Sequence, residues 1–398
     1  MEEKKKKPVK GRDFDSLSGA DAVAFGMRQI NPDVVAAFPI TPQTEIMERF
    51  EKFYANGEVD SEMIRVESEH SAMSAVVGAA AAGARAMTAT AANGLALMWE
   101  IVYIAASTRL PIVMNVVNRA LSGPINIHCD HSDSMGCRDS GWIQIYSENG
   151  QEAYENTIFA VRLAEHPMVR LPVMVCQDGF ITSHSVEPVN FIEDSKVRKF
   201  IGESKPQFSL LDVDKPISLG PLDLFDYYYE HKRQQIEGME NARNAFLDVA
   251  REFKRICGRE MQYFEGYRAK DADYVIVVLS STAGTAKEVV DKLRKEGKKV
   301  GLIRPRLFRP FPYAEIAKAL EGKKAVAVMD RSDSFGAQGG PLFLEICAAL
   351  LNSAKKPKLA DYIYGLGGRD TAMEDIEKVF DELMSGKSKP LNYLGVRE

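Results

Sequence analysis

Short apolar runs alternate with helical stretches along the first part of the chain, and this alternation restricts the fold more than any other feature. The runs with strand character cover residues 34–38, 86–90, 112–117 and 173–177. Strands separated by helices pair in parallel, because a parallel crossover needs a dozen or more residues and is usually a helix. The sequence therefore predicts an α/β fold with a doubly wound, mostly parallel sheet and helices on both faces.

A second, similar pattern begins near residue 260. A charged stretch with helical period covers residues 222–255, and the segment "ADYVIVVLSSTAGTAKEVVDKLRKEGKKVGLIRP" follows it. This segment contains a strand, a Ser/Thr/Gly turn, a helix, a Gly-Lys-Lys turn and another strand, and the run "AVAVMD" continues the pattern. We therefore expect two domains, residues 1–260 and a smaller α/β domain at residues 261–398.

Charge and hydropathy exclude several classes of function. The 398 residues carry a net charge of −5 at pH 7, so no basic excess predicts nucleic-acid binding. The lysine run at residues 4–7 is the exception, and we expect it to be a solvated tail. No apolar run reaches the roughly 18 residues of a membrane span, and no secretory segment is visible. The sequence predicts a cytoplasmic protein that binds neither membrane nor nucleic acid.

The five cysteines contain no Cys-x-x-Cys pair, so we expect neither an iron–sulfur cluster nor a structural zinc site on this chain. Cys129 and Cys137 lie near His128 and His131 in the sequence, but this spacing fits no standard ligand set. No metal is expected, and any electron carrier must belong to another polypeptide. The segment "YGLGGRD" at residues 364–370 lacks the third glycine and the βαβ spacing of a dinucleotide fingerprint, so no nicotinamide or flavin site is predicted.

The turn "FPITP" at residues 38–42 is the first candidate site. Two prolines cannot extend a central strand, but Pro42 can open a helix, which predicts a helix over residues 42–50 capped by Thr41. Thr41 would then lie at the C-terminal end of a strand, where ligands bind in open α/β sheets. The alternative is a helix cap with no further role.

Two glutamates in "RVESEHSAMS" come after a probable strand and before a helix of small residues at 69–84, which we expect to be buried. Either Glu67 or Glu69 is expected at the helix N-terminus, where the dipole favours a carboxylate. Partial desolvation there would raise its pKa and let it share a proton. The alternative is a purely structural, helix-capping acid.

The polar segment at residues 115–142 is a long loop after a strand, and such loops are usually functional. Arg119 follows the strand directly, at the edge where Thr41 is also expected, and its guanidinium suits a carboxylate ligand. The alternative for Arg119 is an ordinary structural ion pair. Asp130, Asp133, Arg138 and Asp139 are expected to tie the loop to itself, whereas His128 and His131 could be hydrogen-bond partners or acid/base groups.

Together these motifs carry a resemblance to a known family. The stretches "FPITP", "VESEHSAMSAVVGAAAAGARAMTATAANGLALM", "LPIVMNVVNRALSGPINIHCDHSDSM", "DGFITSHSVEPV" and "GLGGRD" resemble the alpha subunit of the 2-oxoacid:ferredoxin oxidoreductases over nearly the whole chain. The resemblance implies an N-terminal, pyrimidine-type thiamine diphosphate-binding domain and a transketolase C-terminal-like domain after residue 260.

The resemblance also implies roles for particular residues. Glu69 aligns with the glutamate that hydrogen-bonds the aminopyrimidine ring of thiamine diphosphate, where a shared proton favours the imino tautomer. Thr41 and Arg119 match the residues that contact the carbonyl and carboxylate of the substrate. Pro39, Ile40 and Asn93 are expected in the cofactor cleft. Asn93 stands where glutamine is usual in the family, so the resemblance does not determine the lining of the acyl pocket or the side chain of the substrate.

The activity implied by the resemblance is the reversible conversion of pyruvate, CoA and oxidised ferredoxin to acetyl-CoA, CO₂ and reduced ferredoxin. The pyrophosphate motif is absent, so a beta-type subunit is expected to supply it with Mg²⁺, and [4Fe-4S] clusters are expected on beta, gamma and delta type partners. Alternatives are a branched-chain or other 2-oxoacid substrate, a non-catalytic scaffold subunit, and half of a transketolase-type complex without iron–sulfur chemistry.

Overall fold

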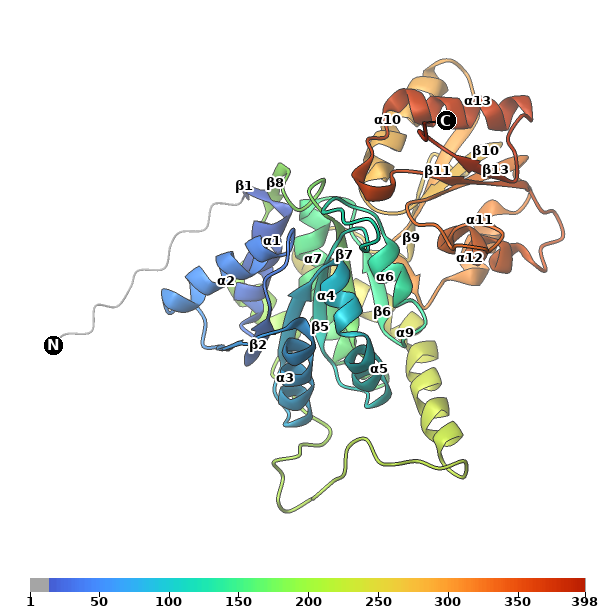
Figure 1. Ribbon diagram of the computed structural model, residues 1–398. Helices are drawn as coiled ribbons and strands as arrows, with labels where there is room; N and C mark the ends of the chain where they lie inside the picture. Colours follow the sequence, from blue (N-terminus) through green and yellow to red (C-terminus); the bar gives the residue numbers. More distant parts are fainter. Residues whose placement is uncertain (1–13, 398) are drawn as a thin grey trace.

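The computed structural model describes residues 14–397, so the lysine run at 4–7 lies outside the described residues. Two large sheets form the centres of two layered α/β parts, and a two-stranded ribbon lies beside the first (Figure 1). The ribbon pairs β1 (Phe14–Ser18) with β8 (Val186–Asn190) in antiparallel fashion. The predicted α/β architecture with two parallel-rich sheets is therefore confirmed.

The first sheet has seven strands, and all of its pairings are parallel except that of β12 with β6. In order across the sheet its strands are β12 (Leu307–Arg309), β6 (Ile143–Tyr146), β7 (Val173–Asp178), β5 (Val113–Asn118), β4 (Ala86–Thr90), β2 (Val34–Ala37) and β3 (Glu62–Arg65). The four strands expected from apolar runs are all present, within two residues at each end.

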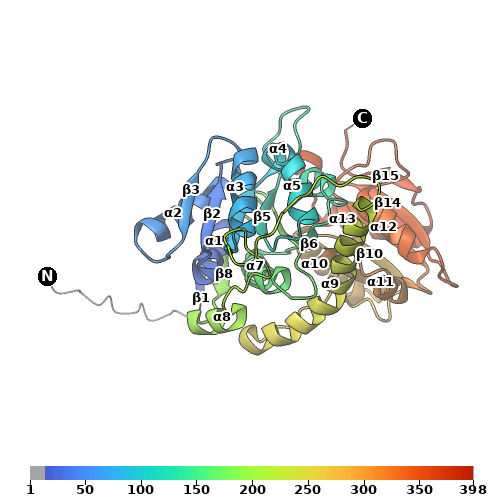
Figure 2. The ribbon, with the colours of Figure 1, turned by 90° about the horizontal axis from the view of Figure 1, so that it is seen from below.

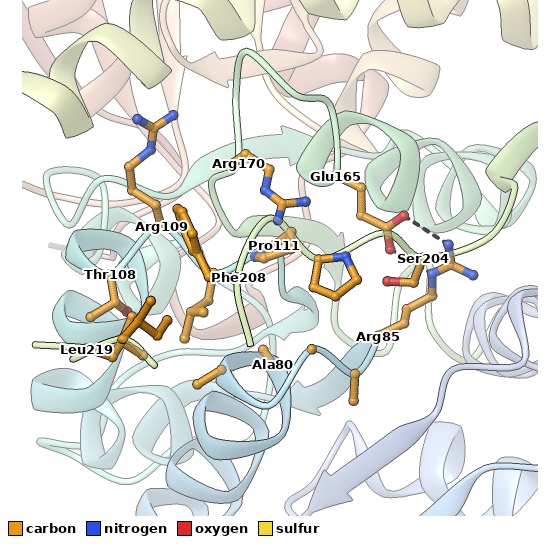
Figure 3. Close-up of a pocket in the computed structure, with 16 residues that line it drawn as sticks. Ala80, Arg85, Thr108, Arg109, Pro111, Glu165, Arg170, Ser204, Phe208 and Leu219 are labelled. Atoms are coloured by element: carbon orange, nitrogen blue, oxygen red, sulfur yellow. Dashed lines mark hydrogen bonds and ion pairs between the residues drawn. The ribbon is translucent and has the colours of Figure 1, made fainter. Parts of the chain in front are cut away.

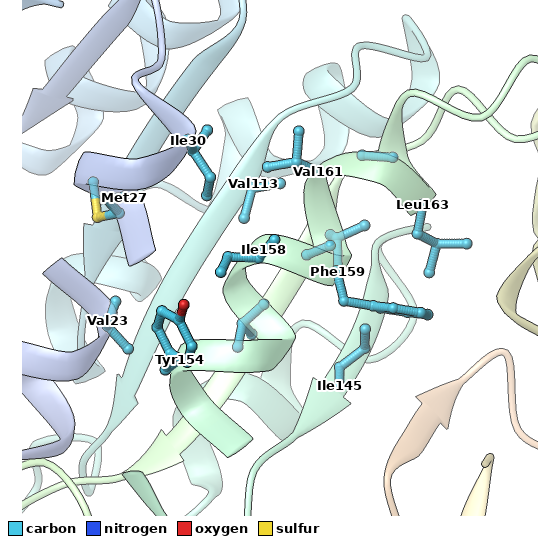
Figure 4. Packing of buried hydrophobic residues seen from close by; sticks show 14 of the residues in the cluster. Val23, Met27, Ile30, Val113, Ile145, Tyr154, Ile158, Phe159, Val161 and Leu163 are labelled. Atoms are coloured by element: carbon cyan, nitrogen blue, oxygen red, sulfur yellow. The ribbon is translucent and has the colours of Figure 1, made fainter. Parts of the chain in front are cut away.

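Apolar residues on both faces of the central strands explain why helices cover both faces of this sheet. In β5, Val113 and Val117 pack into one hydrophobic core and Met114 and Val116 into another. Figure 4 shows the first core, in which side chains of α1 and α7 close over the sheet. The helices of this core are α1 (Gly19–Ile30), α2 (Thr44–Ala55), α7 (Gly150–Ala164), α8 (Asp194–Ile201) and α9 (Tyr228–Cys257). Those of the opposite face are α3 (Glu69–Ala81), α4 (Ala92–Leu97), α5 (Trp99–Ser107) and α6 (Ser132–Gly136).

The second sheet has six strands and is parallel apart from its edge strand β9. In order they are β15 (Leu391–Tyr393), β14 (Lys358–Ile363), β13 (Ala325–Asp330), β10 (Tyr274–Val278), β11 (Val300–Pro305) and β9 (Phe264–Tyr267). The run "AVAVMD" forms β13 as predicted. Helices α10 (Thr282–Lys295) and α13 (Met373–Ser385) cover one face, and α11 (Tyr313–Leu320) and α12 (Pro341–Leu350) cover the other (Figure 1).

Strand β12 belongs to the first sheet although it follows β11 of the second sheet in the chain. The two parts are therefore joined by a shared strand pairing as well as by α9. The expected division at residue 260 stays a prediction.

A long irregular segment, residues 202–227, connects α8 to α9 and runs past the ends of α3 and α5 (Figures 1 and 2). It touches the body of the protein where Leu210 N donates to Ala81 O at 3.0 Å. Beyond that contact it is rich in exposed apolar side chains, with Leu222 at 92% and Phe225 at 90% exposure. We call residues 202–227 the arm.

Two local expectations are wrong. Helix α2 begins at Thr44, not at Pro42, and its N-cap is Gln43, so Thr41 lies in the turn and does not cap the helix. Helix α3 is only partly buried, because Ser74 and Gly78 face outward. Its mostly small residues let one face pack closely while the other remains free. Among residues 14–397, no helix is long and apolar enough to cross a membrane.

Candidate functional site

Four strands of the first sheet end side by side, and the segments that follow them carry the residues expected in the site. Thr41 follows β2, Glu69 follows β3, Asn93 follows β4 and Arg119 follows β5. Because β5, β4, β2 and β3 are neighbours and parallel, their carboxyl ends meet at one edge of the sheet. The structure thus brings these residues to the same edge.

The turn after β2 is fixed by its own hydrogen bonds. Gln43 Oε1 accepts from Ile40 N at 3.3 Å, and Gln43 N donates to Ile40 O at 2.7 Å. Pro42 is buried against Gly179, where an added Cβ would lie 2.8 Å from the proline Cγ. Thr41, in contrast, is exposed. The turn therefore has a rigid buried base and presents Thr41 outward.

Arg119 is nearly buried, at 7% exposure, yet it forms no ion pair within residues 14–397. Its Nη1 donates to Thr41 O at 2.8 Å and its Nε donates to Asn126 O at 2.9 Å. Two neutral carbonyl oxygens orient the guanidinium, and its Nη2 has no partner in the described chain. A buried cation without a carboxylate is costly unless an anion binds it. This geometry is suited to an anionic ligand.

Glu69 is the first residue of α3, and Ser68 caps the helix by accepting from Ser71 N. The Glu69 side chain is 7% exposed and makes no hydrogen bond or ion pair with any residue from 14 to 397. Gly94 leaves room for it, because a Cβ on Gly94 would lie 2.8 Å from Glu69 Oε1 and 2.5 Å from Thr90 Oγ1. The buried hydroxyl of Thr90 also lacks a hydrogen-bond partner in the part of the chain that the structure describes. These unpaired polar groups fit a ligand that donates and accepts hydrogen bonds.

The other glutamate of this motif behaves differently. Glu67 is fully exposed and accepts a hydrogen bond from the Ser71 hydroxyl, which lowers the pKa of Glu67. An exposed, locally satisfied carboxylate is typical of a helix-start acid. The choice between the two glutamates, which the sequence left open, therefore favours Glu69 as the ligand-binding residue.

Asn93 is exposed near the start of α4 and contacts the loop that carries Arg119. Its Oδ1 accepts from Ser122 N at 3.2 Å and from Ser122 Oγ at 2.9 Å. Asn93 therefore joins the loop after β4 to the loop after β5. Asn93 directly precedes Gly94, the residue whose added Cβ would lie 2.8 Å from Glu69 Oε1.

Asp133 holds several parts of the site together, which the sequence analysis did not foresee. Its Oδ2 accepts from Arg119 N at 3.0 Å and from Ala92 N at 2.9 Å, and its Oδ1 accepts from Asn118 Nδ2 at 2.8 Å. Burial raises the pKa of Asp133 to about 6, although the hydrogen bonds oppose this rise. The prediction that Asp133 ties its own loop to itself is incomplete, because the carboxylate also anchors α4.

Asp178, at the end of β7, connects the two parts of the protein. It lies 2.8 Å from His131 Nε2 and 3.1 Å from Arg331 Nη1, and the Ser281 hydroxyl donates to it. Burial raises the pKa of Asp178, but His131 and Arg331 outweigh burial and hold it well below its usual range. Cys129, His131 and Asp178 have ligand atoms within 4.8 Å of one another. We assign no metal to them, because Asp178 already binds Arg331.

A small cavity at the opposite end of the sheet is not a competing site. It has a volume of about 30 Å³ and lies before β4 and β5, where the arm crosses the body (Figure 3). The ion pair of Arg85 Nε with Glu165 Oε1, at 2.7 Å, borders it (Figure 3). A space of this volume holds about one water molecule.

Comparison with known proteins decides the family. The model of the family described as pyruvate flavodoxin/ferredoxin oxidoreductase, thiamine diphosphate-binding, matches residues 25–251. The chain belongs to this family. A second model, pyruvate:ferredoxin oxidoreductase core domain II, matches residues 272–376. The resemblance inferred from the motifs is thereby confirmed, and the N-terminal part is a thiamine diphosphate-binding domain.

Curated relatives match over almost the full chain. Pyruvate synthase subunit PorA of Thermotoga maritima is 61% identical, covering 96% of this chain and 98% of that protein. PorA of Methanocaldococcus jannaschii is 47% identical, covering 96% of this chain and 98% of that protein. Ketoisovalerate oxidoreductase subunit VorA of Pyrococcus abyssi is 44% identical, covering 95% of this chain and 94% of that protein. The chain is therefore a subunit of a pyruvate:ferredoxin oxidoreductase-type enzyme, as predicted.

Solved structures support the fold. A 2-oxoglutarate:ferredoxin oxidoreductase from Magnetococcus marinus superposes with a TM-score of 0.73 at 22% identity, covering 95% of this chain and 67% of that one. A split-gene transketolase superposes with a TM-score of 0.53 at 11% identity, covering 93% of this chain and 99% of that one. These similarities agree with the predicted pair of thiamine diphosphate-type and transketolase-like domains. The roles of the individual site residues remain predictions.

Proposed function

We propose that the enzyme prefers pyruvate, and that Arg119 binds the carboxylate of the 2-oxoacid while Thr41 faces its carbonyl oxygen. The observation that supports this most is the nearly buried Arg119 guanidinium, which no carboxylate neutralises within residues 14–397. Its hydrogen bond to Thr41 O at 2.8 Å places the cation beside the exposed threonine. A 2-oxoacid presents a carboxylate next to a carbonyl, which matches this pair of groups.

Glu69 is proposed to hold the aminopyrimidine of thiamine diphosphate and to share a proton with its ring nitrogen. Its unpaired carboxylate and the space preserved by Gly94 fit such a ring. The bound cofactor supplies the carbanion chemistry that decarboxylation of a 2-oxoacid requires. Pro39 and Ile40 shape the adjacent turn, and Asn93 borders the substrate side through its bond to Ser122. Asp133 positions the Arg119 amide.

The partners are proposed to be a beta-type subunit that binds the diphosphate, Mg²⁺ and a cluster, and gamma and delta type subunits; the [4Fe-4S] clusters of these partners would pass electrons to ferredoxin. The five cysteines of this chain are dispersed, and Cys129, Cys137 and Cys176 are buried. Burial raises the pKa of each of these three thiols, which disfavours the thiolate that a cluster needs. Cluster ligands on partner subunits are consistent with this arrangement.

The assembled complex tests the proposal by its choice of substrate. Its kcat/KM for CoA-dependent ferredoxin reduction is compared for pyruvate, 2-oxoisovalerate and 2-oxoglutarate. Pyruvate is expected to exceed the others by at least about ten-fold, because a pocket that excludes extra methylenes discriminates by about 1–3 kcal/mol. Higher efficiency with 2-oxoisovalerate would favour the branched-chain alternative, which the 44% identity to VorA keeps in view.

A further inference from the structure

The turn "GLGGRD" at residues 365–370 follows β14 of the second sheet and lies against the loop after β5. Within it, Gly367 and Gly368 have positive φ, +60° and +78°. A Cβ on Gly367 would lie 2.5 Å from Asn126 Nδ2, and one on Gly368 would lie 2.3 Å from His128 Cβ. Glycine at these two positions therefore permits a close approach of two segments that belong to different sheets.

Gly367 holds the loop after β5 at two points. Its carbonyl oxygen accepts from Asn126 Nδ2 at 3.0 Å, and its amide donates to Asp130 Oδ2 at 3.2 Å. Residues 121–125 and 127–128 are exposed and form neither helix nor strand, so burial contributes little to the position of this stretch. The position of Asn126 therefore depends on its hydrogen bond to the turn of the second sheet.

The backbone of Asn126 in turn contacts Arg119. Asn126 O accepts from Arg119 Nε at 2.9 Å, and Thr41 O accepts from Arg119 Nη1 at 2.8 Å. These two bonds reach different nitrogens of one planar group and so fix the plane of the guanidinium. A guanidinium forms two parallel hydrogen bonds with a carboxylate only when its plane is correctly oriented. A shift of Asn126 O would therefore turn Arg119 away from its ligand.

We propose that Asn126 and Gly367 are positioning residues for the 2-oxoacid: Gly367 fixes Asn126, and Asn126 orients the guanidinium of Arg119 toward the substrate carboxylate. The inference rests on the proposed function, in which Arg119 binds that carboxylate. It gives the second α/β part a role in substrate affinity, although that part contributes none of the residues proposed to contact the substrate or the cofactor.

The first test is the pyruvate kinetics of the assembled complex with Asn126→Ala, which keeps the backbone oxygen but loses the bond to Gly367 O. The KM for pyruvate should rise by about two- to ten-fold, the usual effect of one lost neutral hydrogen bond, while kcat changes little. A purely structural defect would reduce the amount of active enzyme, which lowers kcat and leaves KM unchanged. Asn241→Ala on α9 is the matched control, because Asn241 Nδ2 also donates to a backbone oxygen, Met168 O at 3.2 Å, and its loss should alter neither constant.

Gly367→Ala tests the same contact from the side of the turn. The added Cβ displaces the Asn126 amide, so the KM for pyruvate should again rise by about two- to ten-fold. Gly386→Ala is the matched control: Gly386 also has a positive φ, +71°, but nothing lies within 4 Å of its added Cβ, so the KM should not change. In the Asn126→Ala background, Gly367→Ala should lose most of its effect, and additive effects would contradict the contact.

Combination with Arg119→Ala decides whether Asn126 acts through the guanidinium. When Arg119 is already alanine, Asn126→Ala should change the KM for pyruvate by less than about two-fold, because coupled residues are not additive. An undiminished effect in that background would overturn the inference, and so would an unchanged KM in Asn126→Ala alone. An unchanged KM in Arg119→Ala alone would instead overturn the proposed function, and this inference with it.

Discussion

At the scale of single residues, Glu69 makes the sharpest prediction. Glu69→Gln keeps the side-chain volume beside Gly94 but cannot share a proton as a carboxylic acid does. We expect pyruvate-dependent ferredoxin reduction to fall by about a hundred- to ten-thousand-fold, which is the usual effect of losing positioned acid–base assistance. Exchange of the cofactor's thiazolium proton, followed by NMR, should slow in parallel. Glu67→Gln is the control, and comparable mild effects of both changes would make Glu69 structural.

Arg119 is expected to act on substrate affinity. Arg119→Ala removes the unpaired guanidinium and should weaken 2-oxoacid binding by about ten- to a hundred-fold, since charged hydrogen bonds contribute about 1.5–3 kcal/mol. Thr41→Ala should have a smaller effect, because Arg119 bonds the backbone oxygen of Thr41 and not its hydroxyl. Steady-state KM values for pyruvate measure both. An unaltered KM in Arg119→Ala would place the carboxylate elsewhere.

Asp133 predicts a pH dependence. Burial raises its pKa to about 6, so acidification below that value protonates the carboxylate that accepts from Arg119 N and Ala92 N. The KM for pyruvate should therefore rise as the pH falls through about 6. Stability should also rise as the pH falls, because the unfolded chain binds this proton only near pH 3.9, so the folded state gains at most about 3 kcal/mol between pH 6 and pH 4.

The Asp133→Asn variant isolates this effect. Its amide cannot titrate, and its NH₂ group faces N–H donors whichever way it turns, so the KM should be raised at every pH. A wild-type KM that stays flat from pH 7 to pH 5 would contradict the role given to Asp133. We also expect the variant to have a lower free energy of unfolding at pH 7, by about 1–3 kcal/mol, because its amide leaves a buried hydrogen-bond donor unsatisfied.

At the residue scale, the sequence predicted the residues proposed to contact ligands but not the contacts that position them. Thr41, Glu69 and Arg119 follow strand ends, so topology alone places them together. Asn126 lies in a loop and Asp133 in the short helix α6 that follows it, and the positions of both depend on distant contacts, such as that of Asn126 with Gly367. No local pattern encodes a partner 241 positions away.

At the scale of elements, the start of α4 controls the shape of the site. Gly94→Ala places a methyl group 2.8 Å from Glu69 Oε1, so the carboxylate must move. We expect weaker binding of thiamine diphosphate by the complex, measured by calorimetry, with a penalty of about 1–3 kcal/mol for overpacking. Gly78→Ala on the outer face of α3 is the control, because nothing lies within 4 Å of its added Cβ. That change should leave cofactor affinity unaltered and slightly stabilise the helix.

The strands were predicted better than the helix starts, for a physical reason. Buried parallel strands are continuous apolar runs, and β13 matches its predicted range fully. The start of α2 depends on the hydrogen bond that the Gln43 side chain accepts from Ile40 N. Hydrophobic periodicity carries no information about such a contact between a side chain and the backbone. Strand β12 was missed, because its three residues gain their strand character from pairing with β6.

At the scale of the whole molecule, the buried pair of Asp178 and Arg331 joins the two sheets. Arg331→Met leaves the Asp178 carboxylate buried without its guanidinium and should lower the free energy of unfolding by about 3–5 kcal/mol. Asp178 has a depressed pKa, so its contribution is present at neutral pH and is lost as the pH falls below about 4. Thermal unfolding from pH 7 to pH 3 measures this, and Asp178→Asn should remove that part of the acid sensitivity.

The arm determines what happens to a copy of this chain made without its partners. Leu222 and Phe225 stay almost fully in water on a segment that the rest of the chain barely covers. Exposed apolar side chains promote self-association, and an irregular, exposed segment is a preferred site of proteolytic cleavage. Unassembled chains would therefore be removed by aggregation or degradation.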